Sequence, residues 1–491
     1  MCEKPNAGSM SKAKRKHALY FHTCLWKEFM AAGIYQKGES MQQKSESRYE
    51  MLTKTPIPKL ILRLSVPTII SMLVTGIYNT ADTFFVGRIS TQATAAVGLV
   101  FSVMAVIQAL GFFAGHGSGN YLSRMLGAGK QQEANIMAST GFALALIMGV
   151  LVAVVGNLFA VPLGYALGAT ETSLHDTMIY MRIILIGAPF MMGQFVINNQ
   201  LRFQGSAFYA MIGLMAGAVL NIGLDPLLMF GLKLGVAGAA IATVCGQIIS
   251  FIVLLAGSRH GDNIRLKLRN IRFNGHYIKE IINGGIPSLF RQGMAAIATL
   301  LLNHAAGSLG GDAAIAGMSV VTRVLMLLSS ALIGFGQGYQ PVCSFNYGAK
   351  LRGRVREGFF FCVKWGTVFL IGAAAVCYAF APGIIGIFRD DPEVIAVGTT
   401  ALRAQAVTLP LMAGIVMTNM MLQSMGKGLK ASIASASRNG IFFIPLILLL
   451  PRLLGLTGVE ITQACADVLS FFLAVPLAAS ELRLMKEQTT N

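Results

Sequence analysis

Charged side chains are scarce in this sequence, at only 12% of 491 residues, whereas soluble domains carry about 25%. Hydrophobic residues make up 54%, in long continuous runs rather than in short alternating segments. This pattern excludes an ordinary soluble domain, and it also excludes a β-barrel, whose strands need roughly ten residues of alternating polarity. The sequence therefore predicts an all-α integral membrane protein.

Cysteine is also sparse, with seven residues and no CxxC pair. Because most of them fall in apolar runs, we expect small buried side chains rather than a disulfide framework or a metal site. The sequence lacks a GxxxxGK[ST] phosphate loop, which argues against direct ATP drive within this chain. It also shows no nucleophile–base pair and no metal-ligand cluster, so we expect neither an enzyme nor a cofactor.

Acidic residues are few, with 21 Asp and Glu against 39 Lys and Arg. Nucleic acid is not the expected partner, because the basic residues lie in loops and in the N-terminal tail. With that tail set aside and placed in the cytoplasm, the cytoplasmic loops hold 17 Lys and Arg. The outer loops hold four, which are Arg88, Lys233, Arg389 and Arg452. This asymmetry predicts that both termini are cytoplasmic.

Twelve apolar runs are long enough to cross a hydrocarbon core of about 30 Å. They lie near 60–86, 93–121, 136–160, 178–200, 208–230, 235–257, 279–307, 313–341, 357–381, 397–424, 430–450 and 455–479. The predicted domains are a disordered polar tail (1–55), a first lobe (56–257), a basic linker (258–278), a second lobe (279–480) and a C-terminal tail (481–491). A natural start at Met51 is left open.

The two predicted lobes share one plan, offset by 219 to 221 residues. The matching landmarks are Pro67 with Pro287, Gly117 with Gly336, Pro162 with Pro382, Arg182 with Arg403, Pro189 with Pro410, Gly205 with Gly426, Pro226 with Pro445, and Gly238 with Gly458. Eight landmarks in one order indicate a duplicated unit. An even number of spans in each half gives both halves the same orientation, with a pseudo-two-fold axis along the membrane normal, as in secondary transporters.

Four oxygen-bearing residues fall at one depth in the first lobe: Asp82, Asn221, Asp225 and Thr243. At 1.5 Å per residue, all four lie within roughly 9–15 Å of the outer basic residues. Charged groups inside a membrane are costly and usually functional. Two carboxylates, an amide and a hydroxyl can hold Na⁺, and a buried carboxylate can equally hold a proton. A purely structural polar network is the alternative.

Other polar residues in the spans are less specific. The end of the fourth span carries Asn198, Asn199 and Gln200, which we interpret as a cytoplasmic mouth. Arg291 and Arg323 lie deeper, and we expect each to pair with an acid such as Asp467 or with backbone carbonyls. The role of Asp467 is left open.

These features resemble the multidrug and toxic compound extrusion (MATE) family, over residues 57–480. The resemblance rests on the two sets of six spans and on several motifs, which are Val66-Pro67, Asn79-Thr80-Ala81-Asp82-Thr83, Val86-Gly87, Arg202-Phe203-Gln204-Gly205, Asn221 with Asp225-Pro226, and Gly235-Val236-Ala237-Gly238-Ala239-Ala240. Within the family, the sequence is most similar to the bacterial MepA-like and DinF-like branch.

The resemblance implies a monomeric antiporter of a bacterial cytoplasmic membrane, surrounded by lipid. It implies export of amphipathic, often cationic drugs or toxins in exchange for Na⁺ or H⁺. The family's first-lobe cation site carries over to Asp82, Asn221, Asp225 and Thr243, and Asn79 is a candidate cavity residue beside it. By the mean offset, the second-lobe counterparts of the four are Leu302, Ile441, Pro445 and Gln463, so coupling is expected in the first lobe alone.

Two other functions are weighed against this one. A lipid-linked oligosaccharide flippase of the same superfamily would often have two further spans and several deep cationic residues. An ion channel would need a repeated selectivity loop, which the sequence lacks. The exact substrates and the choice between Na⁺ and H⁺ are not decided by the sequence.

Overall fold

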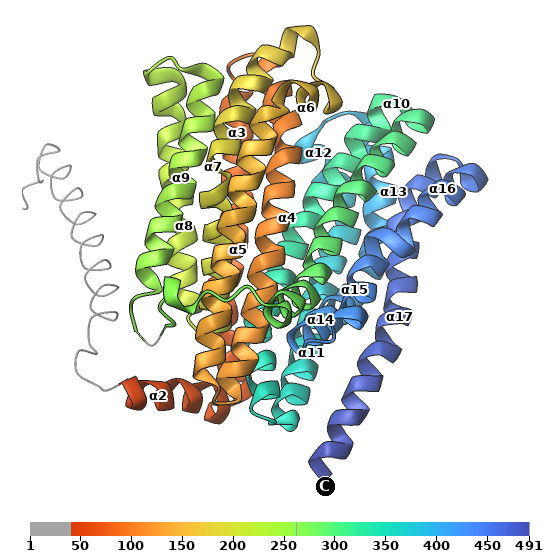
Figure 1. Cartoon of the computed structure of the whole chain (residues 1–491). Coiled ribbons are helices and arrows are strands. Elements are labelled where there is room, and N and C mark those ends of the chain that lie inside the picture. The colour runs from red at the N-terminus through yellow and green to blue at the C-terminus, as the bar shows by residue number, and fades with distance from the viewer. Residues whose placement is uncertain (1–40, 262, 491) are drawn as a thin grey trace, which may run out of the picture. The chain divides into compact units, whose positions relative to one another are not determined.

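The computed structural model describes residues 41–261 and 263–490, without the side chains of 41–47, 77–84, 91 and 488–490. In these residues every regular element is helical, as the apolar runs predict (Figure 1). The polar segment before the first span contains one helix, α2 (Met41–Lys54). The rest of the predicted N-terminal tail, 1–40, lies outside the described residues.

The first half consists of six long helices in chain order. They are α3 (Ile57–Val86), α4 (Thr91–Gly127), α5 (Gln131–Leu158), α7 (Glu171–Phe203), α8 (Ala207–Pro226) and α9 (Gly235–Gly257). A short helix, α6 (Ala160–Ala166), connects α5 to α7. After α8 the chain continues through one π-helical turn, η1 (Leu227–Gly231).

The second half repeats this order with more breaks. Its helices are α10 (Gly275–Gly348), α11 (Arg352–Ala379), short α12 (Ala381–Phe388), α13 (Pro392–Thr408), α14 (Leu411–Ser424), α15 (Gly428–Ala436), π-helical η3 (Ser437–Ile441), α16 (Phe443–Leu454) and α17 (Leu456–Thr490). The short helices α6 and α12 hold equivalent places in the two halves.

The described residues contain ten helices that can each cross a membrane, or eleven if the bent pair α13 and α14 forms one span. Helix α10 is one of these ten helices. Its 74 residues would be about 110 Å long if straight, which is far more than one membrane crossing needs. Its backbone leaves the helical region at Gly311, with φ 59° and ψ −152°. Because Gly311 divides α10 into two spans, the predicted total of twelve is confirmed.

Turn chemistry sets several of the helix ends. The side chain of Ser90 accepts a hydrogen bond from the Ala93 amide at the start of α4, and Asn274 does the same for Tyr277 at the start of α10. Gly205 and Gly426, which are repeat partners, have φ of +81° and +80° after their helices end. Glycine is favoured at both positions because other residues are strained there.

The segment between the halves is short and anchored to the first half. The structure has no regular helix from Ser258 to Asn274 except the 3₁₀ turn η2 (Leu268–Asn270) within the described part of that segment. The Ile264 amide donates to Gln204 Oε1 over 2.6 Å, and the Arg272 amide donates to Thr140 Oγ1 over 3.0 Å. At the other end of the chain, α17 continues through the predicted C-terminal tail to Thr490.

The two halves touch along one set of helix ends. Ser65 Oγ of α3 donates to the Phe335 carbonyl of α10 over 3.0 Å, and Thr68 Oγ1 donates to the Gly334 carbonyl over 2.6 Å. Helix α4 packs against both parts of α10. The buried residues Leu52, Ile57 and Leu60 belong to the same apolar cluster as the core of the second half. We call this contact region the seam.

Candidate functional site

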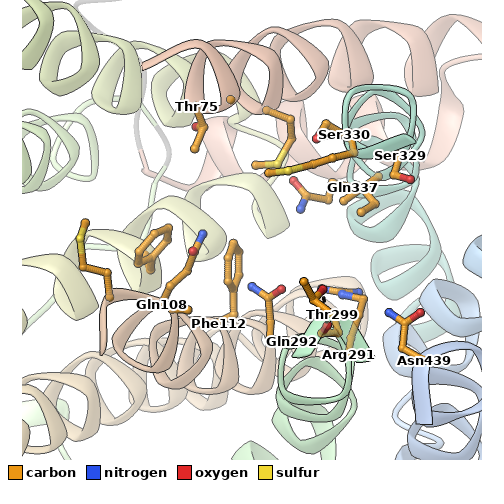
Figure 2. Close-up of a pocket in the computed structure, with 18 of the residues that line it drawn as sticks. Thr75, Gln108, Phe112, Arg291, Gln292, Thr299, Ser329, Ser330, Gln337 and Asn439 are labelled. Carbon is orange, nitrogen blue, oxygen red and sulfur yellow. Dashed lines mark hydrogen bonds between the residues drawn. The ribbon is translucent and has the colours of Figure 1, made fainter. Parts of the chain in front are cut away.

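A cavity of about 530 Å³ lies between the halves, beyond the seam. This volume falls in the range of pockets that hold drug-sized molecules. Its walls are mostly apolar and include Met72 and Met104, with amide and hydroxyl groups between them. Among the described long helices, all except α5 and α11 contribute lining residues, and α16 contributes one, Phe443. Figure 2 shows Gln108 and Phe112 of α4 and Gln292 of α10 among the lining residues.

Three of the predicted cation-site residues meet at the first-half wall of this cavity. Asn221 Nδ2 lies 3.3 Å from Asp225 Oδ1 and 3.5 Å from Thr243 Oγ1. All three side chains are buried, with exposed fractions of 2%, 0% and 4%. Asn221 and Thr243 also line the cavity. The structure thus joins one carboxylate, one amide and one hydroxyl beside a space that can admit a ligand.

Small residues allow this meeting of α8 and α9. A β-carbon on Gly217 of α8 would overlap the Gly246 carbonyl of α9, and one on Gly246 would lie 2.9 Å from the Gly217 carbonyl. The two backbones are therefore in direct contact one helical turn from Asn221. The spacing of four residues then places Asp225 on the same face as Asn221. Local sequence thus explains why these polar groups share one level.

The chemistry of the three side chains fits a hard cation or a proton. Carboxylate, amide and hydroxyl oxygens are the ligands that such cations take in proteins. Asn221 Oδ1 is buried and has no hydrogen-bond partner within the described part of the chain. A buried acceptor without a donor is costly, so a bound cation at this oxygen would remove that cost.

Two predicted residues of this site, Asn79 and Asp82, have side chains outside the described residues. Their backbone belongs to α3, which continues as a helix to Val86. Helix α3 packs along α8, the helix that carries Asn221 and Asp225. The predicted contribution of Asp82 to the cation site remains a prediction.

The three residues assigned to a cytoplasmic mouth are all buried. Asn198 lines the cavity and donates a hydrogen bond to the Ala210 carbonyl over 2.9 Å. Asn199 donates to the Phe195 carbonyl and accepts a hydrogen bond from Arg202. Gln200 donates to Ser118 Oγ and to the Ala138 carbonyl. Gln200 therefore joins α7 to α4 and α5, whereas the hydrogen bonds of Asn199 stay within α7.

Asp467 has a partner that the sequence did not reveal. Arg438 Nε donates to Asp467 Oδ1 over 2.6 Å, and Gln463 Nε2 donates to the same oxygen over 2.9 Å. The expected pairing of Asp467 with Arg291 or Arg323 is wrong, because the π-helical turn η3 presents Arg438 to α17 instead. The sequence does contain one signal for this pairing, because Arg438 is a charged residue within the predicted apolar span 430–450. Arg438 and Gln463 also line the cavity.

Comparison with known proteins identifies the family. The sequence profile of the MatE family matches the chain twice, at residues 67–227 and 287–449, in agreement with the internal repeat. Multidrug export protein MepA of Staphylococcus saprophyticus is 29% identical over 432 residues, which cover 87% of this chain and 94% of that protein. MepA of Staphylococcus aureus is 28% identical over 422 residues, covering 85% and 92%.

Solved structures agree with this match. A structure described as the outward-facing conformation of a multidrug resistance MATE family transporter has a TM-score of 0.83 at 27% identity, covering 89% of this chain and 98% of that one. A MOP superfamily transporter from Pyrococcus furiosus has a TM-score of 0.84 at 26% identity, with the same coverage. Family profile, relatives and fold all agree, and the chain therefore belongs to the MatE family of membrane transporters.

Proposed function

We propose that this protein is a multidrug efflux antiporter, which exports amphipathic, often cationic compounds in exchange for Na⁺ or H⁺. The observation that carries the proposal is a cavity of drug size between two repeated halves, with the Asn221, Asp225 and Thr243 cluster in its wall. The names of the MepA relatives, multidrug export proteins, support the substrate class. The proposal places a monomer in a bacterial cytoplasmic membrane with both termini inside.

Alternating access follows from the position of the seam. Lys and Arg distribution places the start of α3 in the cytoplasm, and the seam then lies on the cytoplasmic side. Under this orientation the closed seam separates the cavity from the cytoplasm, as expected for the state in which a drug leaves and a driving cation enters. Transport then requires the seam to open and the outer ends of the halves to close.

Coupling requires the cation and the drug to favour different states of the protein, because a ligand shifts an equilibrium only through differential affinity. Asn221 supplies this connection, because it lines the cavity and contacts both the buried Asp225 and Thr243. Neutralisation of Asp225 by Na⁺ or H⁺ would change the packing of α8 beside the drug. The cation thus competes with the drug through the same wall.

Ethidium efflux from proteoliposomes tests the proposal, with Na⁺ and pH gradients imposed separately. Asp225→Asn and Asp82→Asn should abolish gradient-driven efflux while the protein still inserts. Asp390→Asn is the matched control, because Asp390 is exposed and lies between α12 and α13. Normal pumping by both site variants would exclude the coupling role of this cluster.

A flippase for lipid-linked oligosaccharides is a second candidate, because Arg291 and Arg438 both line the cavity. Arg438 is neutralised by Asp467, which leaves Arg291 as the cationic group that such a substrate would need. Ethidium efflux by the wild type favours the multidrug antiporter. Translocation of a fluorescent lipid-linked sugar without ethidium efflux would favour the flippase.

A further inference from the structure

Arg291 is an arginine in the cavity wall with no acidic partner. It lies on the first part of α10, four residues after Pro287, and lines the cavity with Gln292 and Thr299 (Figure 2). Within the described residues it makes no hydrogen bond and no ion pair to the protein. A guanidinium inside a membrane is costly unless a negatively charged group neutralises it. That group must come either from the protein or from a bound ligand.

The basic side chains buried near Arg291 do not neutralise its charge. Its charge acts on two buried basic side chains of the first half, Arg202 and His116. Arg202 is 3% exposed and His116 is 0% exposed. Arg202 Nε and His116 Nε2 are buried without a hydrogen-bond partner in the part of the chain that the structure describes. Neither of these two side chains offers Arg291 a negative charge, and neither lines the cavity.

The protein offers little negative charge on this side. Among the described residues that line the cavity, none is Asp or Glu. Asp467 is bound to Arg438 and Gln463, so its carboxylate is already used. Asp225 is buried in the first half, where it contacts Asn221, and it does not line the cavity. The cavity is therefore polarised, with its cationic side on the second half.

We propose that Arg291 binds the acidic group, a carboxylate or a phosphate, of amphipathic substrates. This inference rests on the proposed transport function and refines its substrate class from cationic to zwitterionic or acidic amphiphiles. An arginine fork holds such oxygens with two parallel hydrogen bonds. Gln292 and Asn439 line the same cavity as Arg291 and supply further neutral donors (Figure 2). The aromatic body of the substrate rests on Phe112 and on the methionines of the wall.

Two fluorescent dyes of one scaffold test this proposal. Rhodamine 110 carries a free carboxylate, and rhodamine 123 is its methyl ester, so the pair differs only in the group assigned to Arg291. Binding is measured by fluorescence polarisation on the purified full-length protein. The wild type should bind rhodamine 110 at least tenfold more tightly than Arg291→Gln does, because a charge-assisted bond is lost. Rhodamine 123 should change less than twofold, and Arg291→Lys should give intermediate binding of rhodamine 110.

The matched control is Arg323→Gln, because Arg323 is an exposed arginine of the same helix α10 and does not line the cavity. It should leave both affinities unchanged. Equal loss of both dyes in Arg291→Gln would show a structural role and overturn the proposal. Unchanged binding of rhodamine 110 would overturn it as well. The transport function is judged separately, by wild-type efflux of ethidium, which has no acidic group.

Competition assigns the source of the acidic group. Unlabelled farnesyl phosphate and farnesol are added to the complex with rhodamine 110. Displacement by farnesyl phosphate alone supports recognition of a phosphate on a lipid-like substrate. If neither competes, while the carboxylate preference holds, the site accepts the carboxylates of drug-like molecules. If farnesol competes as well as farnesyl phosphate in both wild type and Arg291→Gln, the wall is selective for apolar bodies and the proposal is wrong.

Discussion

Gly127 and Gly348 mirror one another across the seam. A β-carbon on Gly127 would overlap the carbonyl oxygen of Phe345, and a β-carbon on Gly348 would overlap that of Arg124. Gly127 and Gly348 are 221 positions apart, as are Arg124 and Phe345, which agrees with the offset of the repeat. The ends of α4 and α10 therefore cross in reciprocal contact, and each half supplies the glycine that admits the backbone of the other.

Gly127→Ala is expected to open the seam. Its methyl group meets a backbone carbonyl that cannot rotate away, and overpacking of this kind costs about 1–3 kcal/mol. The cost applies only while the seam is closed, so the state with the seam open gains population by roughly 5- to 160-fold. Spin labels at exposed Gln132 and Arg356 should report a longer distance.

Gly353→Ala is the control for that substitution, because a β-carbon on Gly353 meets nothing within 4 Å. It should leave the label distance unchanged. An unchanged distance in Gly127→Ala as well would mean that the closed seam tolerates the methyl group.

Glu280→Gln should also weaken the seam, through charge rather than volume. Arg124 Nη2 of the first half lies 2.8 Å from Glu280 Oε2 of the second, with side chains 12% and 26% exposed. Arg124 Nη1 also reaches the Ser424 carbonyl at 3.4 Å. Loss of the acid leaves a largely buried guanidinium unpaired, and we expect a cost of about 1–3 kcal/mol. The same label pair should show a larger open fraction.

The exposed pair Lys54 and Glu50 provides the comparison for Glu280→Gln. Its side chains are 71% and 56% exposed, and exposed pairs contribute about 0–1 kcal/mol. Glu50→Gln should leave the label distances as they are. An equal response in the two variants would assign the effect to net charge and not to the inter-lobe ion pair.

Sequence patterns predict the spans well and their bends poorly. The apolar runs and the landmark spacing define twelve crossings, because membrane thickness fixes the length of each. Pro189 and Pro410 are repeat partners, yet α7 continues through Pro189 while α13 and α14 meet at 59° around Pro410. A proline removes one hydrogen bond in either case, and the packing of neighbouring helices decides whether the helix bends.

The depth of each residue in the membrane, counted along its span, predicts which polar side chains of the candidate site lie at one level. Residue counts from the outer loop place Asn221 and Thr243 at one level, and the structure brings them within hydrogen-bond distance. The rotation of each helix about its axis is not available from such counts. For this reason Arg438 was missed as the partner of Asp467, and the cavity position of Arg291 was not distinguished from that of Arg323.

Thr243→Val should lower cation-driven efflux about tenfold while Thr243→Ser keeps most of it. Valine preserves the shape and removes the hydroxyl oxygen that Asn221 contacts, and a lost hydrogen bond of this kind costs about 1–2 kcal/mol. The measurement is the initial rate of ethidium efflux as a function of Na⁺ concentration and of pH.

Thr462→Val is the control for that series. Thr462 is buried like Thr243, but its hydroxyl donates within its own helix, to the Gly458 carbonyl over 2.6 Å. A threonine bonded in this way adds little to the stability of its helix, so efflux should be normal. A rate lowered equally in Thr462→Val would indicate general damage to packing.

Asp467→Asn should destabilise the second half, and a second substitution at Arg438 should restore part of the loss. Asp467 is 4% exposed and Arg438 is 22% exposed, so removal of the acid leaves a partly desolvated guanidinium without its counter-ion. Breaking a pair of this kind costs about 3 kcal/mol when it is fully buried, and less here because Arg438 reaches the cavity.

The double variant Arg438→Gln with Asp467→Asn removes both charges and retains amides that can bond to each other. Thermal unfolding of the purified protein should therefore rank wild type highest, the double variant next and Asp467→Asn lowest. A double variant less stable than Asp467→Asn would show that the two residues stabilise the protein independently, through contacts other than their ion pair.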